Sequence, residues 1–114
     1  MLIYKEALPA DTMDIRVIRL PYADIRDARD AIFHLEMQYG EPCMWYQADS
    51  GEEDREYLLI AIGTGHDWED SLNREAYIGT LLLAGGSLVL HYFLTEIPNP
   101  AEGESDTYET VSGD

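Results

Sequence analysis

The fold is decided by residues 77–95, which read YIGTLLLAGGSLVLHYFLT. Two largely apolar runs, Tyr77–Ala84 and Leu88–Thr95, flank the pair Gly85-Gly86. Glycine has no side chain and therefore adopts the positive φ angles that a tight hairpin turn requires. This stretch predicts an antiparallel β-hairpin, the clearest in the chain.

Alternation of apolar and polar residues predicts strands in most of the remaining chain. One such strand covers Ala31–Tyr39, with His34, Glu36 and Gln38 on its polar face. Its expected core face comprises Ala31, Phe33, Leu35, Met37 and Tyr39. Further strands are expected at Leu2–Leu8, Ile15–Leu20, Cys43–Ala48 and Tyr57–Ile62. The last of these is apolar on both faces, so we expect it in the middle of a sheet or between two layers.

The connections contain turn and bulge signals. Gly40-Glu-Pro42 predicts a tight connection between two strands. Adjacent Val17 and Ile18 predict either a β-bulge or burial on both faces of their strand.

Two short helical turns are expected. Asp24–Asp30 is one, because Ile25, Ala28, Ile32 and Leu35 fit a helical stripe; the alternation after Ala31 keeps this turn short. Asp67 is a candidate cap for the other, in which Trp68 and Leu72 lie four residues apart on one face.

These elements predict a mainly β fold: a small antiparallel sandwich or open barrel of about seven short strands with one or two short helical turns. We expect one β-rich domain over residues 1–96 and an acidic tail over residues 97–114, which has no Lys or Arg. The chain has one cysteine, no leader pattern and no run of ~20 apolar residues. A soluble cytosolic protein is therefore expected.

Charge narrows the class of partner. The chain has 23 acidic and 7 basic residues, a formal net charge of -16, in 114 residues. Such a field repels nucleic acid and anionic membranes and attracts basic surfaces. We expect neither direct nucleic-acid binding nor membrane binding, and we expect a protein partner with a basic surface.

Few residues have the pattern of a catalytic or metal site. Gly63-Thr-Gly-His66 resembles part of a phosphate loop but lacks the lysine and the alternating α/β context, so a sharp turn is the simpler interpretation. His66, Asp67 and Asp70 come from one loop and do not make a metal cage alone, and Cys43 has no predicted base beside it. We expect no enzyme activity, no catalytic residue, no metal and no cofactor.

Carboxylates gather in two polar loops, and these loops are the predicted partner-binding surface. Spaced carboxylates can imitate the phosphates of nucleic acid, and a tryptophan can anchor the contact. The candidate residues are Glu52, Glu53, Asp54, Asp67, Trp68, Glu69 and Asp70.

Four short motifs, at residues 40–45, 62–66, 77–80 and 84–93, resemble in their order a family of small phage and prophage proteins of unknown function. The resemblance covers roughly residues 2–93 and implies a compact β domain and a phage source. Extra residues around Tyr22–Asp30 and the tail depart from the family pattern. The family has no assigned catalytic residues to carry over.

The resulting hypothesis is a small acidic phage protein that acts in the host cytoplasm. It would inhibit a host defence complex, of the anti-CRISPR or anti-restriction type, by occupying a basic nucleic-acid-binding surface as a DNA mimic. One alternative is a virion-associated structural subunit, and a two-fold dimer is a generic expectation for a small protein. Another is a small-molecule or nucleotide-binding sponge, which would need four clustered arginines to converge: Arg16, Arg19, Arg26 and Arg29.

Overall fold

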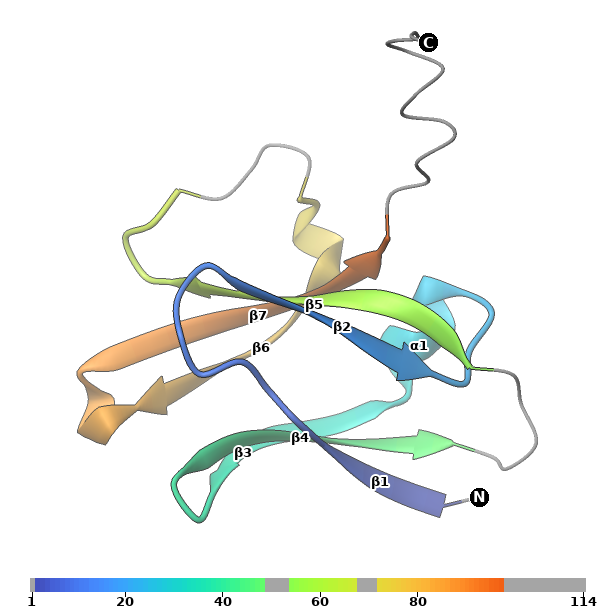
Figure 1. The fold of residues 1–114 in the computed structure, drawn as a ribbon, viewed down its shortest axis with the longest axis horizontal. Coiled ribbons are helices and arrows are strands. Elements are labelled where there is room, and N and C mark those ends of the chain that lie inside the picture. The colour runs from blue at the N-terminus through green and yellow to red at the C-terminus, as the bar shows by residue number, and fades with distance from the viewer. Residues whose placement is uncertain (1, 49–53, 68–71, 98–114) are drawn as a thin grey trace, which may run out of the picture.

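The chain forms a two-layer β-sandwich in a computed structural model that describes residues 2–48, 54–67 and 72–97 (Figure 1). A three-stranded antiparallel sheet has the order β1-β4-β3, and a four-stranded antiparallel sheet has the order β2-β5-β7-β6. The strands are β1 (Leu2–Ala7), β2 (Asp14–Leu20), β3 (Ile32–Gln38), β4 (Glu41–Ala48), β5 (Arg55–Gly63), β6 (Tyr77–Leu83) and β7 (Leu88–Glu96). The predicted mainly β fold is confirmed, as a sandwich and not as an open barrel.

The β6–β7 hairpin forms as predicted. Leu83 pairs with Leu88, and the turn between them contains Ala84, Gly85 and Gly86, with φ angles of 52°, 70° and 97°. The two glycines supply most of the left-handed conformation that this reversal needs.

The β3–β4 turn differs from the prediction. Its two central residues are Tyr39 and Gly40, with φ angles of 52° and 80°, and Gln38 pairs with Glu41. Two consecutive positive φ angles give the turn a twist that matches antiparallel strands. The predicted connection Gly40–Pro42 is therefore wrong by two residues, because Glu41 and Pro42 already belong to β4.

A bulge interrupts the alternation expected in β3. The register against β4 shifts between Ile32 and His34, so Phe33 is the extra residue and its side chain is 55% exposed. Leu35 and Met37 pack against the core as predicted, whereas Tyr39 is 96% exposed in the turn. The predicted core face is wrong at Phe33, because the bulge turns this extra residue outward, and at Tyr39, because this residue lies in the turn beyond β3.

Strand β2 contains neither feature predicted at Val17 and Ile18. Its register with β5 is continuous from Asp14 to Leu20. Ile18 is buried, whereas Val17 is 52% exposed on the opposite face. Both the bulge and the burial on two faces are therefore wrong; β2 is an edge strand with one face toward solvent.

The first predicted helical turn is confirmed as α1 (Ile25–Asp30). The Asp24 side chain accepts a hydrogen bond from the backbone N–H of Arg26 at 2.7 Å, which caps the helix. The predicted helix at Asp67 and Trp68 falls mostly outside the described residues. A 3-10 turn, η1 (Arg74–Ala76), follows, and Leu72 beside it packs on the outer cluster formed by Ile62, Ala76 and Phe93.

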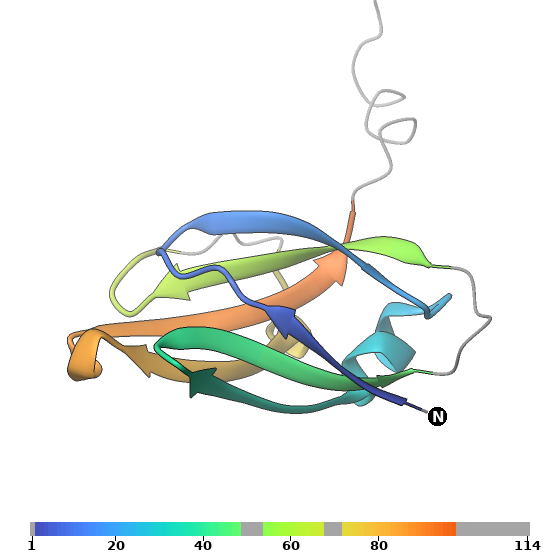
Figure 2. The same cartoon turned by 60° about the horizontal axis from the view of Figure 1, so that its bottom comes forward.

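The main core lies between the two sheets, and β5 is an inner strand flanked by β2 and β7 as predicted. Buried tyrosines reach backbone carbonyls there. Tyr57 of β5 donates to the carbonyl of Tyr22, and Tyr22 donates to the carbonyl of Gln47 in β4. These bonds connect the two sheets, whose two-layer arrangement is seen in Figure 2. Tyr92, fully buried, donates to the carbonyl of Pro9 at 2.7 Å. Each hydroxyl is thus paired, which removes the cost of burying it.

Replacing Tyr92 with Phe tests the contribution of this hydrogen bond. The carbonyl of Pro9 would lose its partner, and we expect Tyr92→Phe to lower the free energy of unfolding by about 1–3 kcal/mol in urea denaturation. Tyr39→Phe is the matched control, because Tyr39 is 96% exposed and should change stability by less than about 0.5 kcal/mol. Equal effects of the two substitutions would contradict the role given to the Tyr92 hydroxyl.

The same variant should change how the free energy of unfolding depends on pH in alkaline solution. Burial raises the pKa of Tyr92 to about 12, and the charge of Arg16 opposes the shift. An unfolded tyrosine titrates near pH 10, so the stabilising contribution is complete below pH 10 and is lost as pH rises through about 12. Tyr92→Phe should therefore lose less stability than wild type between those values, as measured by urea midpoints across the pH series.

Tyr39 occupies a left-handed conformation that asparagine adopts more readily. We expect Tyr39→Asn to raise the free energy of unfolding by about 1 kcal/mol and Tyr39→Val to lower it, since a β-branched side chain resists positive φ. Thermal unfolding of the three proteins measures both changes. If the two substitutions had equal effects, the assigned turn conformation would be incorrect.

Candidate partner-binding surface

Charged side chains lie on the surface throughout the described part of the chain, in which none is buried. Few of the acidic ones are neutralised locally. Glu56 pairs with Arg19 at 3.1 Å, and Glu36 pairs with His34 at 2.5 Å. The other described carboxylates have no ion-pair partner among residues 2–48, 54–67 and 72–97: Glu6, Asp11, Asp14, Asp24, Asp27, Asp30, Glu41, Asp54, Asp67, Glu75 and Glu96.

Several of these unpaired carboxylates gather at the end of the sandwich that contains α1. Burial raises the pKa of Tyr57. The carboxylates of Glu96, Asp24 and Asp27 raise it further, and the positive charge of Arg55 opposes them. Three carboxylates from two elements, the start of α1 and the end of β7, therefore act on one hydroxyl. Asp54, immediately before β5, lies at the same end, because Arg55 pairs with Leu20 four residues before Asp24. We call Asp24, Asp27, Asp54 and Glu96 the α1-end patch.

Antiparallel topology brings this patch together. Strands β2 and β7 end where β5 begins. Three segments therefore lie at the same end of the four-stranded sheet: the loop that leads to Asp24, Asp54 just before β5, and Glu96 at the end of β7. A second tyrosine responds to the same field: burial raises the pKa of Tyr46, and Glu6 and Asp54 raise it further. The patch is thus held on elements whose backbones are paired, not on a single loop.

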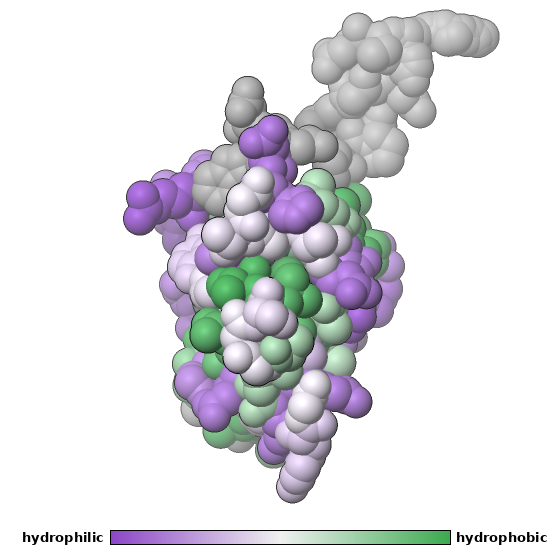
Figure 3. All heavy atoms as spheres, turned by 90° about the vertical axis from the view of Figure 1, so that its left-hand side faces the viewer, coloured by the Kyte–Doolittle hydropathy of each residue, from purple (hydrophilic) through white to green (hydrophobic). Residues whose placement is uncertain are grey.

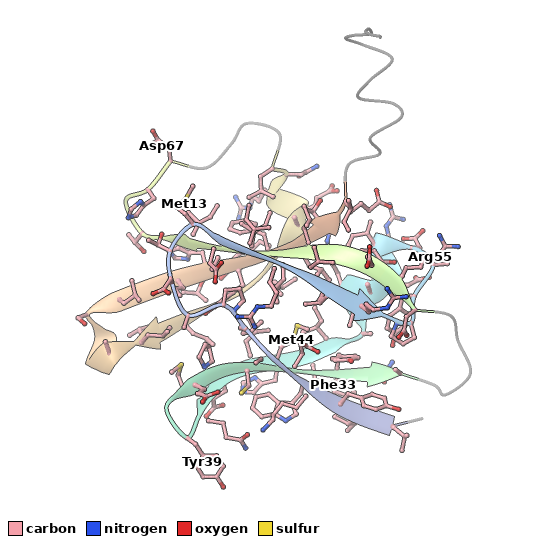
Figure 4. All side chains as sticks on the ribbon, viewed as in Figure 1. Met13, Phe33, Tyr39, Met44, Arg55 and Asp67 are labelled. Carbon is pink, nitrogen blue, oxygen red and sulfur yellow. The ribbon has the colours of Figure 1, made fainter. Side chains whose placement is uncertain are left out.

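The two predicted site residues that the structure describes, Asp54 and Asp67, do not share one surface. Asp54 precedes β5, and Asp67 follows its other end; nine residues at ~3.3 Å each separate them by about 30 Å. Figure 4 shows Asp67 and Arg55 at opposite ends of the molecule. The remaining candidates lie outside the described residues: Glu52, Glu53, Trp68, Glu69 and Asp70.

Sequence reasoning missed Asp24, Asp27 and Glu96 as members of a shared patch. They are isolated along the chain, and only the strand order places them beside Asp54.

The end of the sandwich that carries the β6–β7 turn differs: Figure 3 shows apolar side chains gathered at its centre with hydrophilic groups around them, and Leu82 there is 60% exposed. The surface charge is therefore uneven.

The glycine motif at the end of β5 forms a turn. A side chain on Gly63 would lie 2.8 Å from the Thr12 hydroxyl, and Gly65 has a φ of 92°. The backbone N–H of His66 donates to the carbonyl of Gly63 at 3.1 Å. These contacts close the strand end, as the simpler interpretation predicted, and Gly63 is needed because Thr12 fills the space beside it.

The side chains of His91 and Cys43 are already engaged. The two ring nitrogens of His91 are hydrogen-bonded to Thr64 at 2.6 Å and to Thr80 at 2.9 Å. Cys43 is buried, and its thiol lies 3.6 Å from the carbonyl of Glu41. Among the described residues, no three His, Cys, Asp or Glu side chains are grouped as metal ligands, and no helix is long and apolar enough to span a membrane.

The four clustered arginines do not converge. Arg16 donates to the carbonyl of Ala7 at 3.0 Å, and Arg19 pairs with Glu56. Arg26 and Arg29 line one groove of about 520 Å³ beside the start of β6, and Asp30 and Glu75 line it as well. With two positive and two negative side chains, this groove does not offer the convergent cations that the nucleotide-sponge hypothesis requires.

A family model described as Domain of unknown function (DUF7352) matches residues 1–103. The match spans most of the chain, and the chain therefore belongs to this family of uncharacterised domains. No curated protein and no solved structure matches it. The resemblance to an uncharacterised family is thus confirmed, and it extends beyond the motifs at residues 40–93, whereas the phage source stays a prediction.

The unpaired carboxylates predict a salt-dependent stability. At about 10 mM salt the screening length is about 30 Å, so charges across the whole molecule repel one another; at about 150 mM it is about 8 Å. We expect NaCl to raise the free energy of unfolding by about 0.5–1 kcal/mol over this range, and the urea midpoint should rise with it. A midpoint that stayed constant or fell would show that these carboxylates do not repel one another as described.

Proposed function

We propose that this DUF7352 chain is a small, non-enzymatic inhibitor that binds the basic, nucleic-acid-binding surface of another protein through its α1-end patch. The observation that carries the proposal is the set of unpaired carboxylates held together from separate elements. Asp24 and Asp27 come from the start of α1, Asp54 precedes β5 and Glu96 ends β7. Acidic groups that form no ion pair leave much of their field available to an external basic surface.

The geometry supports mimicry of a nucleic-acid backbone. A basic groove that binds duplex DNA neutralises phosphates placed every ~1.7 Å along the helix axis. Carboxylates on a pre-ordered scaffold can take the place of several phosphates without the entropy cost of ordering a flexible segment. The capping bond that fixes Asp24 and the antiparallel pairing that fixes Glu96 supply this order.

Several observations favour binding over catalysis. His91 lies between two threonine hydroxyls, and the Cys43 thiol is buried, so these two side chains are poorly placed to act as a base or a nucleophile. The pKa values of Tyr46, Tyr57 and Tyr92 are raised, chiefly by burial, which moves them away from the range of a general base at neutral pH.

The phage resemblance supplies the proposed context. A small acidic phage protein made in the host cytoplasm would meet restriction enzymes and CRISPR effectors, which bind nucleic acid through basic channels. We therefore place the proposed target among host defence complexes. Binding should weaken as salt rises, since it depends on exchange of counterions and on exposed charges.

Two variants with equal charge change test the site. The first removes three charges of the patch with Asp27→Asn, Asp54→Asn and Glu96→Gln; the second removes three elsewhere with Asp11→Asn, Glu41→Gln and Asp67→Asn. Each tagged protein is used to capture basic complexes from a bacterial lysate, and bound proteins are quantified by mass spectrometry. We expect the first variant to lose about tenfold or more of the recovered complex and the second to lose little.

The second variant is the control for net charge, because both variants carry three fewer negative charges. Circular dichroism and urea midpoints confirm that both fold. Equal losses in the two variants would show that total charge, and not the α1-end patch, drives capture. Undiminished capture by the first variant would overturn the proposed surface.

A further inference from the structure

Strand β1 leaves one edge of the three-stranded sheet open. It pairs with β4 on one side, and on the other side no strand formed by residues 2–48, 54–67 or 72–97 lies beside it. At the far side of the sandwich the two edge strands β3 and β6 contact each other, so that side is closed. Figure 1 shows the first half of β1 at the margin of the molecule, away from the four-stranded sheet.

Alternate residues of β1 form hydrogen bonds to β4, and this alternation identifies which backbone groups of β1 face outward. The N–H of Leu8 donates to the carbonyl of Pro42 at 3.0 Å, so Leu8 and every second residue before it bond to β4. The N–H and C=O groups of Ile3, Lys5 and Ala7 therefore point away from the sheet. Arg16 occupies the carbonyl of Ala7, which leaves those of Ile3 and Lys5 without a protein partner in the described part of the chain.

The large apolar side chains of β1 are uncovered on both faces. Ile3 is 64% exposed on the outer face, and Leu2 is 55% exposed on the other. Tyr4 stacks on the core residue Tyr46 with ring centroids 5.7 Å apart, so Leu2 and Tyr4 extend the core face, yet Tyr4 remains 39% exposed. An edge of this kind favours the addition of another strand.

We propose that β1 pairs with β1 of a second copy, antiparallel across a two-fold axis at Tyr4. Ile3 of each copy then lies opposite Lys5 of the other, and their outward N–H and C=O groups form four hydrogen bonds. The two Tyr4 rings meet on the core face. The two three-stranded sheets become one six-stranded sheet with no free β1 edge, as a closed isologous dimer requires.

Charge favours pairing at this edge and disfavours a register centred on Lys5. Lys5 is the only lysine in a chain of net charge -16, and with Glu6 it makes β1 neutral, so two copies approach over an edge that carries little of their repulsion. A shift that centred the axis on Lys5 would oppose two ammonium groups and would need the Ala7 carbonyl that Arg16 already binds. Pairing across Tyr4 avoids both.

The dimer is independent of the proposed inhibitor function and has the opposite response to salt. Pairing of two copies of an acidic chain strengthens as salt screens their repulsion, whereas binding to a basic partner weakens. Sedimentation of the purified chain, which contains no partner, therefore tests the dimer alone.

Charge substitutions at position 3 test the register. In the proposed pairing, Ile3→Glu brings a carboxylate opposite Lys5 of the second copy, and Ile3→Lys brings an ammonium group there. We expect the dimer of Ile3→Glu to have a dissociation constant about tenfold lower than that of Ile3→Lys, measured by sedimentation equilibrium at about 150 mM salt. Net charge alone predicts the reverse order, because Ile3→Glu makes the chain more acidic.

A matched pair at Leu82, which is 60% exposed on β6, supplies the control. Leu82→Glu should dimerise no more tightly than Leu82→Lys.

A proline at position 3 tests the backbone pairing itself. Ile3→Pro removes an outward N–H without breaking a bond to β4, and it should give a folded monomer. A wild-type chain that stays monomeric up to about 1 mM, well above the range of a specific dimer, would overturn the proposal, as would tighter dimerisation of Ile3→Lys than of Ile3→Glu.

Discussion

The structure depends on the constraint that a carboxylate cannot enter the core without a partner. With 23 acidic residues and 7 basic ones, the chain has too few cations to pair its acids inside. The described core therefore contains apolar side chains and tyrosines, and the Tyr57 and Tyr92 hydroxyls donate to backbone carbonyls. The acids that the core excludes form the outer shell, so the same constraint that permits the fold also produces the surface on which the proposed function depends.

Topology then determines where the negative charge concentrates. Antiparallel pairing of β2, β5 and β7 brings the residues beside three strand ends to one edge, where the cap of α1 adds Asp24. Pairing also leaves β1 as an edge strand whose Ile3 and Lys5 backbone groups have no protein partner in the described part of the chain. The molecule can thus make two kinds of contact by different forces: long-range electrostatic attraction through the α1-end patch, and directional hydrogen bonding through β1.

Much of the fold could be predicted because local patterns agree with it: the seven strands and α1 lie close to where the apolar patterns, the Gly85-Gly86 turn signal and the helical stripe from Ile25 indicate. Errors arose where one residue changes the geometry. The bulge at Phe33 turns this extra residue outward, and Tyr39 accepts a positive φ that its residue type does not indicate. The α1-end patch could not be predicted, since Asp54 and Glu96 meet only through strand order, and the predicted acidic loops fall at opposite ends of β5.

The most direct test of the account is competition for a captured host complex. Labelled duplex DNA is bound to the basic complex recovered with the chain, and DNA anisotropy is followed as unlabelled chain is added at low and at raised salt. The account predicts displacement of the DNA at low salt, with less displacement per added chain as salt rises. Simultaneous binding of DNA and chain would contradict it, because the two would then occupy different surfaces.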